Sequence, residues 1–326
     1  MIFLDYTISI TNRCNLHCSY CYERHLNTDY GCVDDETADK ITEFINGRGD
    51  AGTVYLFGGE PLLFKERIKK FRETINAKEF VITTNGTLLD EDFIKWCSER
   101  KVIINMSHDG CRCEERGADT KLLDTNLRML LKYQPETLVQ LVYTEKTLPE
   151  LYSNIMYLKN LGVKKVSAAL NAFTEPADPD SFGDILMEQW RKIAEEDIYI
   201  YELAVKRKTV RENKSGKCEI CRKKIFINWD GRIYPCIQFQ NRREFQCGDI
   251  VSGINADEAR KAHPDYSSVS ERCEGCEISQ YCRNSCACRK MATTGTVRDI
   301  SEAACLEEQV LILTVLEQMN KKIKKK

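Results

Sequence analysis

Residues 14–21 read CNLHCSYC, and this stretch decides how the rest of the chain is interpreted. Its cysteines follow DYTISI (residues 5–10), a run of β-branched and apolar residues that predicts a first strand. In parallel α/β folds, the loops after the carboxyl ends of strands gather ligand-binding residues. We therefore expect Cys14, Cys18 and Cys21 to be ligands on such a loop.

The spacing C-x3-C-x2-C supplies three thiolates and no fourth. Three closely spaced thiolates can hold three irons of a 4Fe–4S cluster and leave the last iron open to another molecule. The alternative is zinc, which in structural sites ordinarily takes four protein ligands and favours C-x2-C pairs. The spacing favours a cluster and leaves zinc as the alternative.

Composition limits the classes of protein to consider. The chain has 326 residues, of which 42% are hydrophobic and 17 are cysteines. No secretory signal or membrane-spanning run is visible, so we expect a cytoplasmic protein, where thiols stay reduced and ligation is their natural use. The net charge of -2 gives no overall field that would attract nucleic acid or an anionic membrane.

Up to about residue 200, apolar or β-branched runs alternate with stretches of helical period, which predicts βα units around a parallel sheet. Strands are expected at residues 5–10, 53–58, 80–84, 102–107, 137–143 and 165–170. Helices are expected at residues 36–46 and 148–158.

The composition changes near residue 210, where cysteines begin to dominate and periodicity fades. We expect an α/β domain over residues 1–210, a cysteine-rich domain over residues 211–305, and a C-terminal helix with a basic tail over residues 306–326. Bound metal, more than a large apolar core, is expected to order the cysteine-rich part.

With Tyr20 at its aromatic position, the cysteine loop resembles the C-x3-C-x-aromatic-C signature of the radical S-adenosylmethionine (SAM) enzymes. Gly58-Gly59-Glu60-Pro61, after the second expected strand, resembles the GGEP-type motif with which this family receives the SAM amino group. Two glycines let backbone carbonyls approach an ammonium closely, and the glutamate supplies a complementary charge.

Two weaker signals agree with this resemblance. Asn85, within Thr84-Asn85-Gly86, and Ser107 end the third and fourth expected strands, and resemble the family's polar positions around the SAM ribose and carboxylate. The resemblance implies a partial (β/α)6 barrel and an enzyme that binds SAM at its cluster. A flavodoxin or ferredoxin-type donor would supply the electron, and a 5′-deoxyadenosyl radical would abstract hydrogen from a substrate.

The later cysteines also follow fixed spacings, and these resemble the SPASM domain, which binds two auxiliary 4Fe–4S clusters. The pattern is Cys221-x9-Gly231-x4-Cys236, Cys273-x2-Cys276-x5-Cys282-x3-Cys286 and Cys305. The resemblance assigns Cys221, Cys236 and Cys286 to one cluster, and Cys273, Cys276, Cys282 and Cys305 to the other. Cys218, three residues before Cys221, is the candidate fourth ligand of the first cluster, and an iron left open to a substrate thiolate is the alternative. Three 4Fe–4S clusters are then expected in all, with zinc again as the alternative. The Asp-Gly pair in WDGRIYPC predicts a turn between two strands that delivers Cys236.

Six cysteines remain: Cys32, Cys97, Cys111, Cys113, Cys247 and Cys288. A small buried hydrophobe is the default interpretation of each. Cys111 and Cys113 follow the fourth expected strand in SHDGCRC, so they are also weak candidates for a hydrogen-atom donor or a substrate contact.

Three functions stay open. The first is a maturase that forms a thioether or carbon–carbon crosslink in a ribosomally made peptide, which can be cysteine-rich. The second is an anaerobic sulfatase-maturating enzyme, although such enzymes generally have an acidic residue after the cysteine of the YPC-like segment, where this chain has Ile237. The third is a SAM-binding iron–sulfur electron carrier. Because the first strand begins almost at Met1, we expect any leader peptide to be bound by the barrel, the SPASM region or a separate leader-binding protein.

Overall fold

The structure is a computed structural model that describes residues 4–26, 29–111, 113–213, 223–261, 273–282 and 286–324. The chain forms two compact units that alternate along the sequence. The first comprises Met1–Ser107, Glu114–Thr137 and Glu219–His263, and the second comprises His108–Cys113, Leu138–Cys218 and Pro264–Lys326. Each unit contains segments from before and after residue 210, and the domain limits expected from composition stay a prediction.

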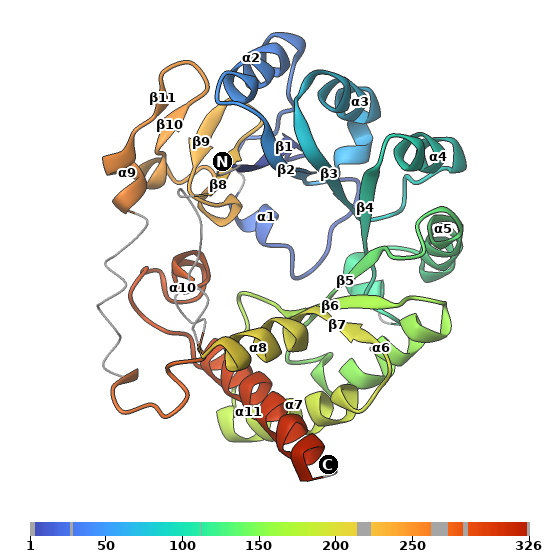
Figure 1. Ribbon diagram of the computed structural model, residues 1–326, viewed down its shortest axis with the longest axis vertical. Coiled ribbons are helices and arrows are strands. Elements are labelled where there is room, and N and C mark those ends of the chain that lie inside the picture. Colours follow the sequence, from blue (N-terminus) through green and yellow to red (C-terminus); the bar gives the residue numbers. More distant parts are fainter. Residues whose placement is uncertain are drawn as a thin grey trace. The chain divides into compact units, whose positions relative to one another are not determined.

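The first unit is built on parallel strands, each paired with the next one along the chain (Figure 1). They are β1 (Asp5–Thr11), β2 (Ala51–Gly58), β3 (Ala77–Thr84) and β4 (Val102–Ser107). Buried apolar side chains recur along them, and Ile8, Leu56 and Ile104 are completely buried. Because these strands run in one direction, their carboxyl ends lie at one edge of the sheet.

Helices cover one face of these strands (Figure 1). They are α2 (Asp35–Asn46), α3 (Lys65–Thr74), α4 (Glu91–Glu99) and α5 (Thr120–Tyr133), and the short helices α1 (Tyr22–Leu26), η1 (Pro61–Phe64) and η2 (Cys113–Arg116) occupy the loops. Asp34 and Asp90 cap α2 and α4, since their carboxylates accept the N–H groups of Thr37 and Phe93 at 2.8 Å.

The segment after residue 223 joins β1 on its other side. β8 (Lys224–Ile227) runs parallel to β1, with Tyr6 opposite Ile225. β9 (Arg232–Tyr234), β10 (Gly248–Asp249) and β11 (Gly253–Ile254) follow in antiparallel pairs, accompanied by η4 (Ile237–Phe239), η5 (Arg243–Phe245) and α9 (Ala256–Lys261). Gly231, with a φ of 83°, completes the turn between β8 and β9, which confirms the expected Asp-Gly turn.

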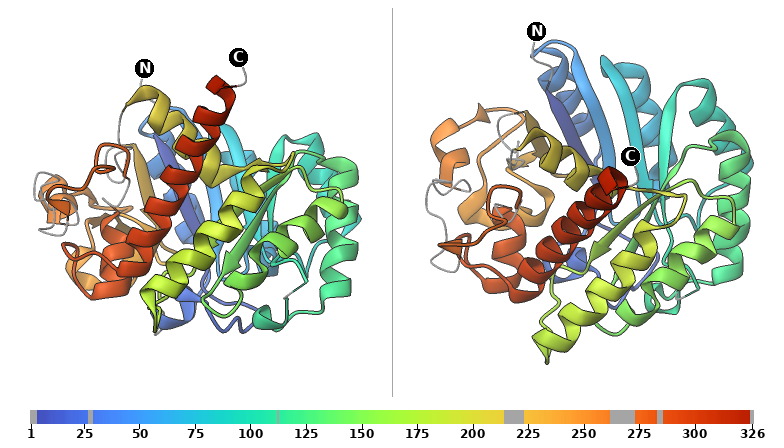
Figure 2. Two further views of the ribbon diagram at one scale, coloured as in Figure 1. Left: turned by 90° about the horizontal axis from the view of Figure 1, so that it is seen from below. Right: turned by 60° about the horizontal axis from the view of Figure 1, so that its bottom comes forward.

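The second unit contains β5 (Leu138–Tyr143), β6 (Lys165–Leu170) and β7 (Tyr199–Ile200), paired in parallel in that order. Its helices are η3 (Leu148–Glu150), α6 (Leu151–Asn160), α7 (Pro179–Ala194), α8 (Tyr201–Glu212), α10 (Ala287–Thr294) and α11 (Glu302–Lys324). The long helix α11 packs along α7 and α8 (Figure 2). Lys206 of α8 and Glu308 of α11 form a buried ion pair in this interface.

The six strands expected from the sequence are present as β1 to β6, with small shifts at their ends. The two expected helices correspond to α2 and to η3 followed by α6. The strands β7, β10 and β11 were not expected, because two residues are too few to show a period. In the described ranges, no helix has the length and apolar character needed to cross a membrane.

Candidate active site

The carboxyl end of β2 lies against the segment that leads from β1 into the first cysteines. The N–H groups of Gly59 and Glu60 donate to the carbonyl oxygens of Thr11 and Arg13, both at 2.8 Å. A Cβ atom at Gly59 would lie 2.4 Å from the Arg13 oxygen, and one at Gly58 would lie 2.0 Å from the Thr11 oxygen. Only glycine permits this approach, so the two glycines fix the start of the cysteine loop, residues 14–21.

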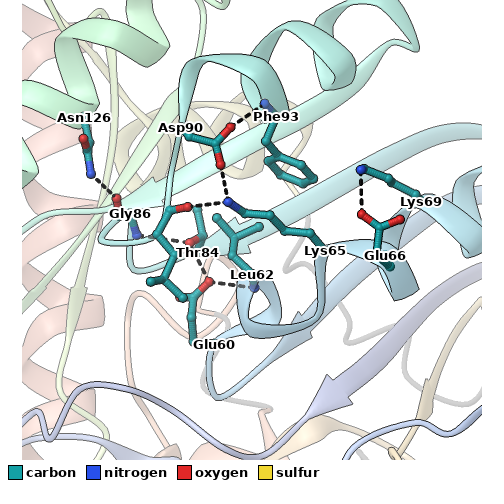
Figure 3. A network of polar contacts seen from close by, with 11 residues as sticks. Glu60, Leu62, Lys65, Glu66, Lys69, Thr84, Gly86, Asp90, Phe93 and Asn126 are labelled. Atoms are coloured by element: carbon teal, nitrogen blue, oxygen red, sulfur yellow. Dashed lines mark hydrogen bonds and ion pairs between the residues drawn. The ribbon is translucent and has the colours of Figure 1, made fainter.

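Glu60 is completely buried, and its carboxylate bonds to groups inside the protein (Figure 3). One oxygen accepts the Leu62 N–H at 2.9 Å and the Thr84 hydroxyl at 2.7 Å, and the other accepts the Asn85 N–H at 2.7 Å. Burial raises the pKa of Glu60 to about 7, although these hydrogen bonds and the Lys65 charge oppose the rise. Glu60 therefore holds the turn after β2 against the end of β3, while its contact with the SAM amino group stays a prediction.

The network continues beyond that carboxylate on both sides (Figure 3). Thr84 Oγ1 accepts the Gly86 N–H at 3.1 Å, and the Gly86 carbonyl accepts the side chain of Asn126, from α5, at 2.8 Å. On the other side, Lys65 pairs with Asp90 at the start of α4. Connected polar contacts of this kind hold the ends of β2 and β3 in one arrangement.

Asn85, the residue after β3, reaches the cysteine loop. Its side-chain nitrogen donates to Asn15 Oδ1 at 2.9 Å and lies 3.8 Å from the Cys14 sulfur. Thr87 fixes this orientation, because its hydroxyl donates to the Asn85 side chain at 2.7 Å and accepts from Asn15 at 2.8 Å. Ser107 ends β4, the neighbour of β3, and so lies at the same edge of the sheet. The structure thus brings Asn85 and Cys14 together.

Helix η2 holds the other end of the cysteine loop. The N–H of Ser19 donates to the Glu115 carbonyl at 2.9 Å, and its hydroxyl lies 3.1 Å from the Glu115 carboxylate. The guanidinium of the buried Arg116 lies 5.7 Å from the centre of the Tyr20 ring, within cation–π range. Neither Glu115 nor Arg116 stands out in the sequence, because a short charged run is typical of a solvated turn.

The thiols of the cysteine loop are half-buried and form no disulfide. Burial is the largest cause that raises the pKa of Cys14, and the charges of Glu60 and Cys21 add to it. Burial also raises the pKa of Cys21. Metals bind the thiolate form, so ligation here would release protons.

In the second unit, Cys111 and Cys113 differ in exposure. Cys111 is exposed, and its sulfur donates to the Asn154 side-chain oxygen at 3.0 Å. Cys113 has no exposed surface, and its sulfur lies 3.3 Å from the Gly110 carbonyl oxygen and 3.5 Å from His108 Nδ1. A completely buried thiol cannot touch a substrate in this conformation, so the substrate-contact role predicted for Cys113 is not supported, and Cys111 alone keeps it as a prediction.

The later cysteines are described in part, because Cys218 and Cys221 lie outside the described residues. The other predicted ligands are half-buried thiols that form no disulfide: Cys236, Cys273, Cys276, Cys282, Cys286 and Cys305. In the second unit, burial and the charges of Cys305 and Cys276 raise the pKa of Cys273. Their membership of one cluster stays a prediction.

Three of the remaining cysteines, Cys97, Cys247 and Cys288, are buried, and burial raises the pKa of Cys97 to about 12. Cys288 does more than fill space, because its hydrogen bond to the predicted ligand Cys286 is the largest cause that lowers the pKa of that thiol. Cys32 is half-buried. The high pKa keeps Cys97 in its neutral thiol form, which suits a core position.

Within the described ranges, no three cysteine, histidine or carboxylate side chains converge closely enough to hold a metal ion. The donor set still fits iron–sulfur ligation, because the predicted ligands of these ranges are thiols that form no disulfide. In the segment that contains Cys236, the side-chain oxygens of Asn228 and Gln238 and the indole N–H of Trp229 are buried without a hydrogen-bond partner. Such atoms require a partner such as water or a bound group.

Comparison with known proteins places this site in a family context. Residues 8–167 match the family profile described as the radical SAM superfamily. The matched range contains the cysteine loop, the glycine turn after β2, and the Thr84-Asn85 segment. All of these lie at the carboxyl ends of the strands in the first unit.

Two relatives and one solved structure match most of the chain. The chain is 26% identical over 317 residues to the cysteine-type anaerobic sulfatase-maturating enzyme of Clostridium perfringens, covering 84% of this chain and 85% of that protein. It is 24% identical over 312 residues to the antilisterial bacteriocin subtilosin biosynthesis protein AlbA of Bacillus subtilis, covering 86% of this chain and 66% of that protein. The solved structure of native anSMEcpe with bound AdoMet has a TM-score of 0.79 at 21% identity, covering 99% of this chain and 100% of that one. This likeness confirms the expected α/β fold class.

Proposed function

We propose that this chain, which carries a radical SAM domain over residues 8–167, is a peptide maturase that forms a thioether or a carbon–carbon crosslink. The observation that carries the proposal is the meeting of three segments in the first unit. The ends of β1, β2 and β3 bring together Cys14, Gly59 and Asn85, residues that come from three separate motifs. The relatives named above act, by their names, in sulfatase maturation and subtilosin biosynthesis.

In this proposal, Cys14, Cys18 and Cys21 hold three irons of a 4Fe–4S cluster and leave the fourth for SAM. When both are bound and an electron arrives from a flavodoxin or ferredoxin-type donor, they supply a 5′-deoxyadenosyl radical. The protein keeps the loop in place through the Asn85 and Ser19 contacts. A loop held in this way loses little freedom when the cofactor binds.

The predicted SAM contacts have distinct tasks. Gly58 and Gly59 form the turn whose backbone would face the SAM amino group, and Glu60 fixes that turn through its bonds to η1 and the end of β3. Asn85 and Ser107 would contact the ribose and the carboxylate. Since Glu60 is already bonded on both oxygens, its main effect on SAM is expected to come through the turn.

The auxiliary clusters would serve the oxidation. Crosslinking removes one hydrogen atom, which goes to the radical, and then a proton and an electron from the substrate. When bound, the auxiliary clusters would accept that electron. The proposed ligands are Cys218, Cys221, Cys236 and Cys286 for one cluster, and Cys273, Cys276, Cys282 and Cys305 for the other.

Formylglycine formation is the second candidate, because the similarity to the sulfatase-maturating enzyme spans most of both chains. Against it stands Ile237, which begins η4 directly after Cys236, where those enzymes generally have an acidic residue. No carboxylate follows the cysteine in the next two positions either, since Gln238 and Phe239 complete η4. This local difference favours crosslinking of a ribosomally made peptide, with a separate leader-binding protein as a further expected partner.

The test uses the full chain, reconstituted anaerobically with iron and sulfide. We expect about twelve irons per chain and 5′-deoxyadenosine that forms only with a reductant. A short cysteine-rich peptide and a sulfatase peptide containing the active-site cysteine are the two probes. Crosslinking removes two hydrogens and keeps sulfur, whereas formylglycine formation from cysteine loses sulfur and gives an aldehyde. Fully loaded protein that cleaves no SAM would overturn the enzyme proposal in favour of an electron carrier.

A further inference from the structure

A buried hydrogen bond joins the two cysteine-bearing segments of the first unit. The side-chain nitrogen of Gln240 donates to the Glu23 carboxylate at 2.5 Å, across 217 positions of sequence. Glu23 is 6% exposed and Gln240 is completely buried. Helix α1, which contains Glu23, packs against η4, which directly precedes Gln240. The bond therefore belongs to a packed interface within this unit.

Each partner lies close in sequence to a predicted cluster ligand. Glu23 is two positions after Cys21, and Gln240 is four positions after Cys236. The turn from Cys236 to Gln240 is closed, because the Phe239 N–H donates to the Cys236 carbonyl at 2.9 Å. A displacement of Gln240 would therefore also displace Cys236.

The burial of the Glu23–Gln240 hydrogen bond makes it costly to break. A buried carboxylate is costly to leave without donors, and a hydrogen bond to a charged group is stronger than one between neutral groups. Separation of the two segments would remove the Gln240 donor from the Glu23 carboxylate. The distance between the segments is therefore well defined by the protein itself.

We propose that Glu23 and Gln240 are positioning residues that hold the Cys236 segment at a fixed separation from the cysteine loop. They would thereby set how well the first auxiliary cluster communicates with the SAM-binding cluster. This inference rests on the proposed function, because it requires clusters at both places. Neither residue touches the reacting atoms.

The test compares Glu23→Ala and Gln240→Ala with the exchanged double variant Glu23→Gln/Gln240→Glu. Hydrogen exchange of the unloaded protein measures the link directly, and we expect segments 14–26 and 236–245 to exchange about tenfold faster in both single variants. After loading, we expect unchanged iron content and unchanged SAM cleavage without substrate. The yield of product per 5′-deoxyadenosine should fall about tenfold, and the electron paramagnetic resonance signal of the auxiliary cluster should change.

The matched control is Glu196→Ala, which removes a carboxylate bonded to Tyr152 and Lys159 in the second unit. It should leave both segments and the product yield unchanged, and the exchanged double variant should restore them. If Glu23→Ala fails to fold, Glu23→Gln replaces it and should give a smaller effect in the same direction. The inference is overturned if either single variant keeps the exchange rates and the product yield of the wild type. Failure of the proposed function would look different, since the wild type itself would then lack clusters or SAM cleavage.

Discussion

The two cysteine regions of this chain are ordered by different means. The cysteine loop follows a seven-residue strand of a parallel sheet, and Asn85 and Ser19 hold it by hydrogen bonds. The later region relies on short elements, such as the two-residue strands β10 and β11. A site that must keep one iron open benefits from order supplied by the protein. A site with a full set of ligands can take its order from the bound metal.

The largest expected effect separates the two regions by function. Replacement of Cys14, Cys18 and Cys21 with Ala should abolish SAM cleavage and remove about four irons from about twelve per chain. The thermal unfolding temperature should change little, because hydrogen bonds of the protein order this loop. Product analysis, iron analysis and calorimetry check the three statements. Cys32→Ala is the control, and SAM cleavage by the triple variant would contradict the ligand assignment.

The opposite pattern is expected for the later region. Cys273→Ala combined with Cys276→Ala should also remove about four irons, while SAM cleavage without substrate continues. Limited proteolysis should cut the later region of this variant much faster than in the wild type, because we propose that bound metal is its main source of order. A variant that stays as resistant as the wild type would show that the two regions do not differ in this way.

A third prediction tests the order supplied by the protein at the first region. Gly59→Ala should destabilise the fold by about 3 kcal/mol or more, because its Cβ would lie 2.4 Å from the Arg13 oxygen. The Michaelis constant for SAM should rise as well. Gly183→Ala in α7 is the matched control, since its Cβ would meet Leu306 at an ordinary 3.5 Å. Denaturant unfolding of both variants measures the two changes in unfolding free energy.

A smaller effect concerns pH. The folded-state pKa of Glu60 is raised to about 7 from an ordinary 4.5, so its stabilising contribution is complete below pH 4.5 and is lost as pH rises through 7. Relative to Glu60→Gln, the unloaded wild type should lose roughly 2 to 3 kcal/mol of unfolding free energy between pH 5 and pH 8. If the unfolding free energies of the two proteins changed with pH in the same way, the raised pKa of Glu60 would be refuted.

The smallest effect is expected at Cys111. Its thiol is hydrogen-bonded to Asn154 but is exposed and contributes little to packing. Cys111→Ala should therefore leave the unfolding free energy within about 0.5 kcal/mol of the wild type. SAM cleavage without substrate should not change. A loss of product with normal 5′-deoxyadenosine formation would instead identify Cys111 as a hydrogen-atom donor or substrate contact.

Sequence patterns located the site but not its internal contacts. The strand preceding Cys14 and the strand preceding Gly58 are readable because long runs of β-branched residues carry a clear period. The hydrogen bonds that Glu60 makes with Thr84 and Asn85 cannot be predicted from the sequence, because a motif identifies a residue but not its hydrogen-bond partners. The burial of Cys113 was equally hidden, since its neighbours are typical of an exposed loop.

Contacts between residues far apart in the sequence could not be predicted for a related reason. Glu23 occurs in a short charged segment that would ordinarily face solvent, and its partner Gln240 is 217 positions away. The parallel pairing of β8 with β1 joins residues that are similarly distant, Tyr6 and Ile225. No local period encodes such contacts, because they depend on the path of the whole chain between the two segments.

The pairing of β8 with β1 has a practical consequence. β1 is an interior strand, with β2 on one side and β8 on the other. A chain cut where the composition changes, near residue 210, would leave the backbone N–H and C=O groups of residues 5–8 bare along an open edge. Open edges of this kind recruit strands from other molecules. The shortened protein would be expected to aggregate, so the place where the composition changes is not a safe place to divide the gene.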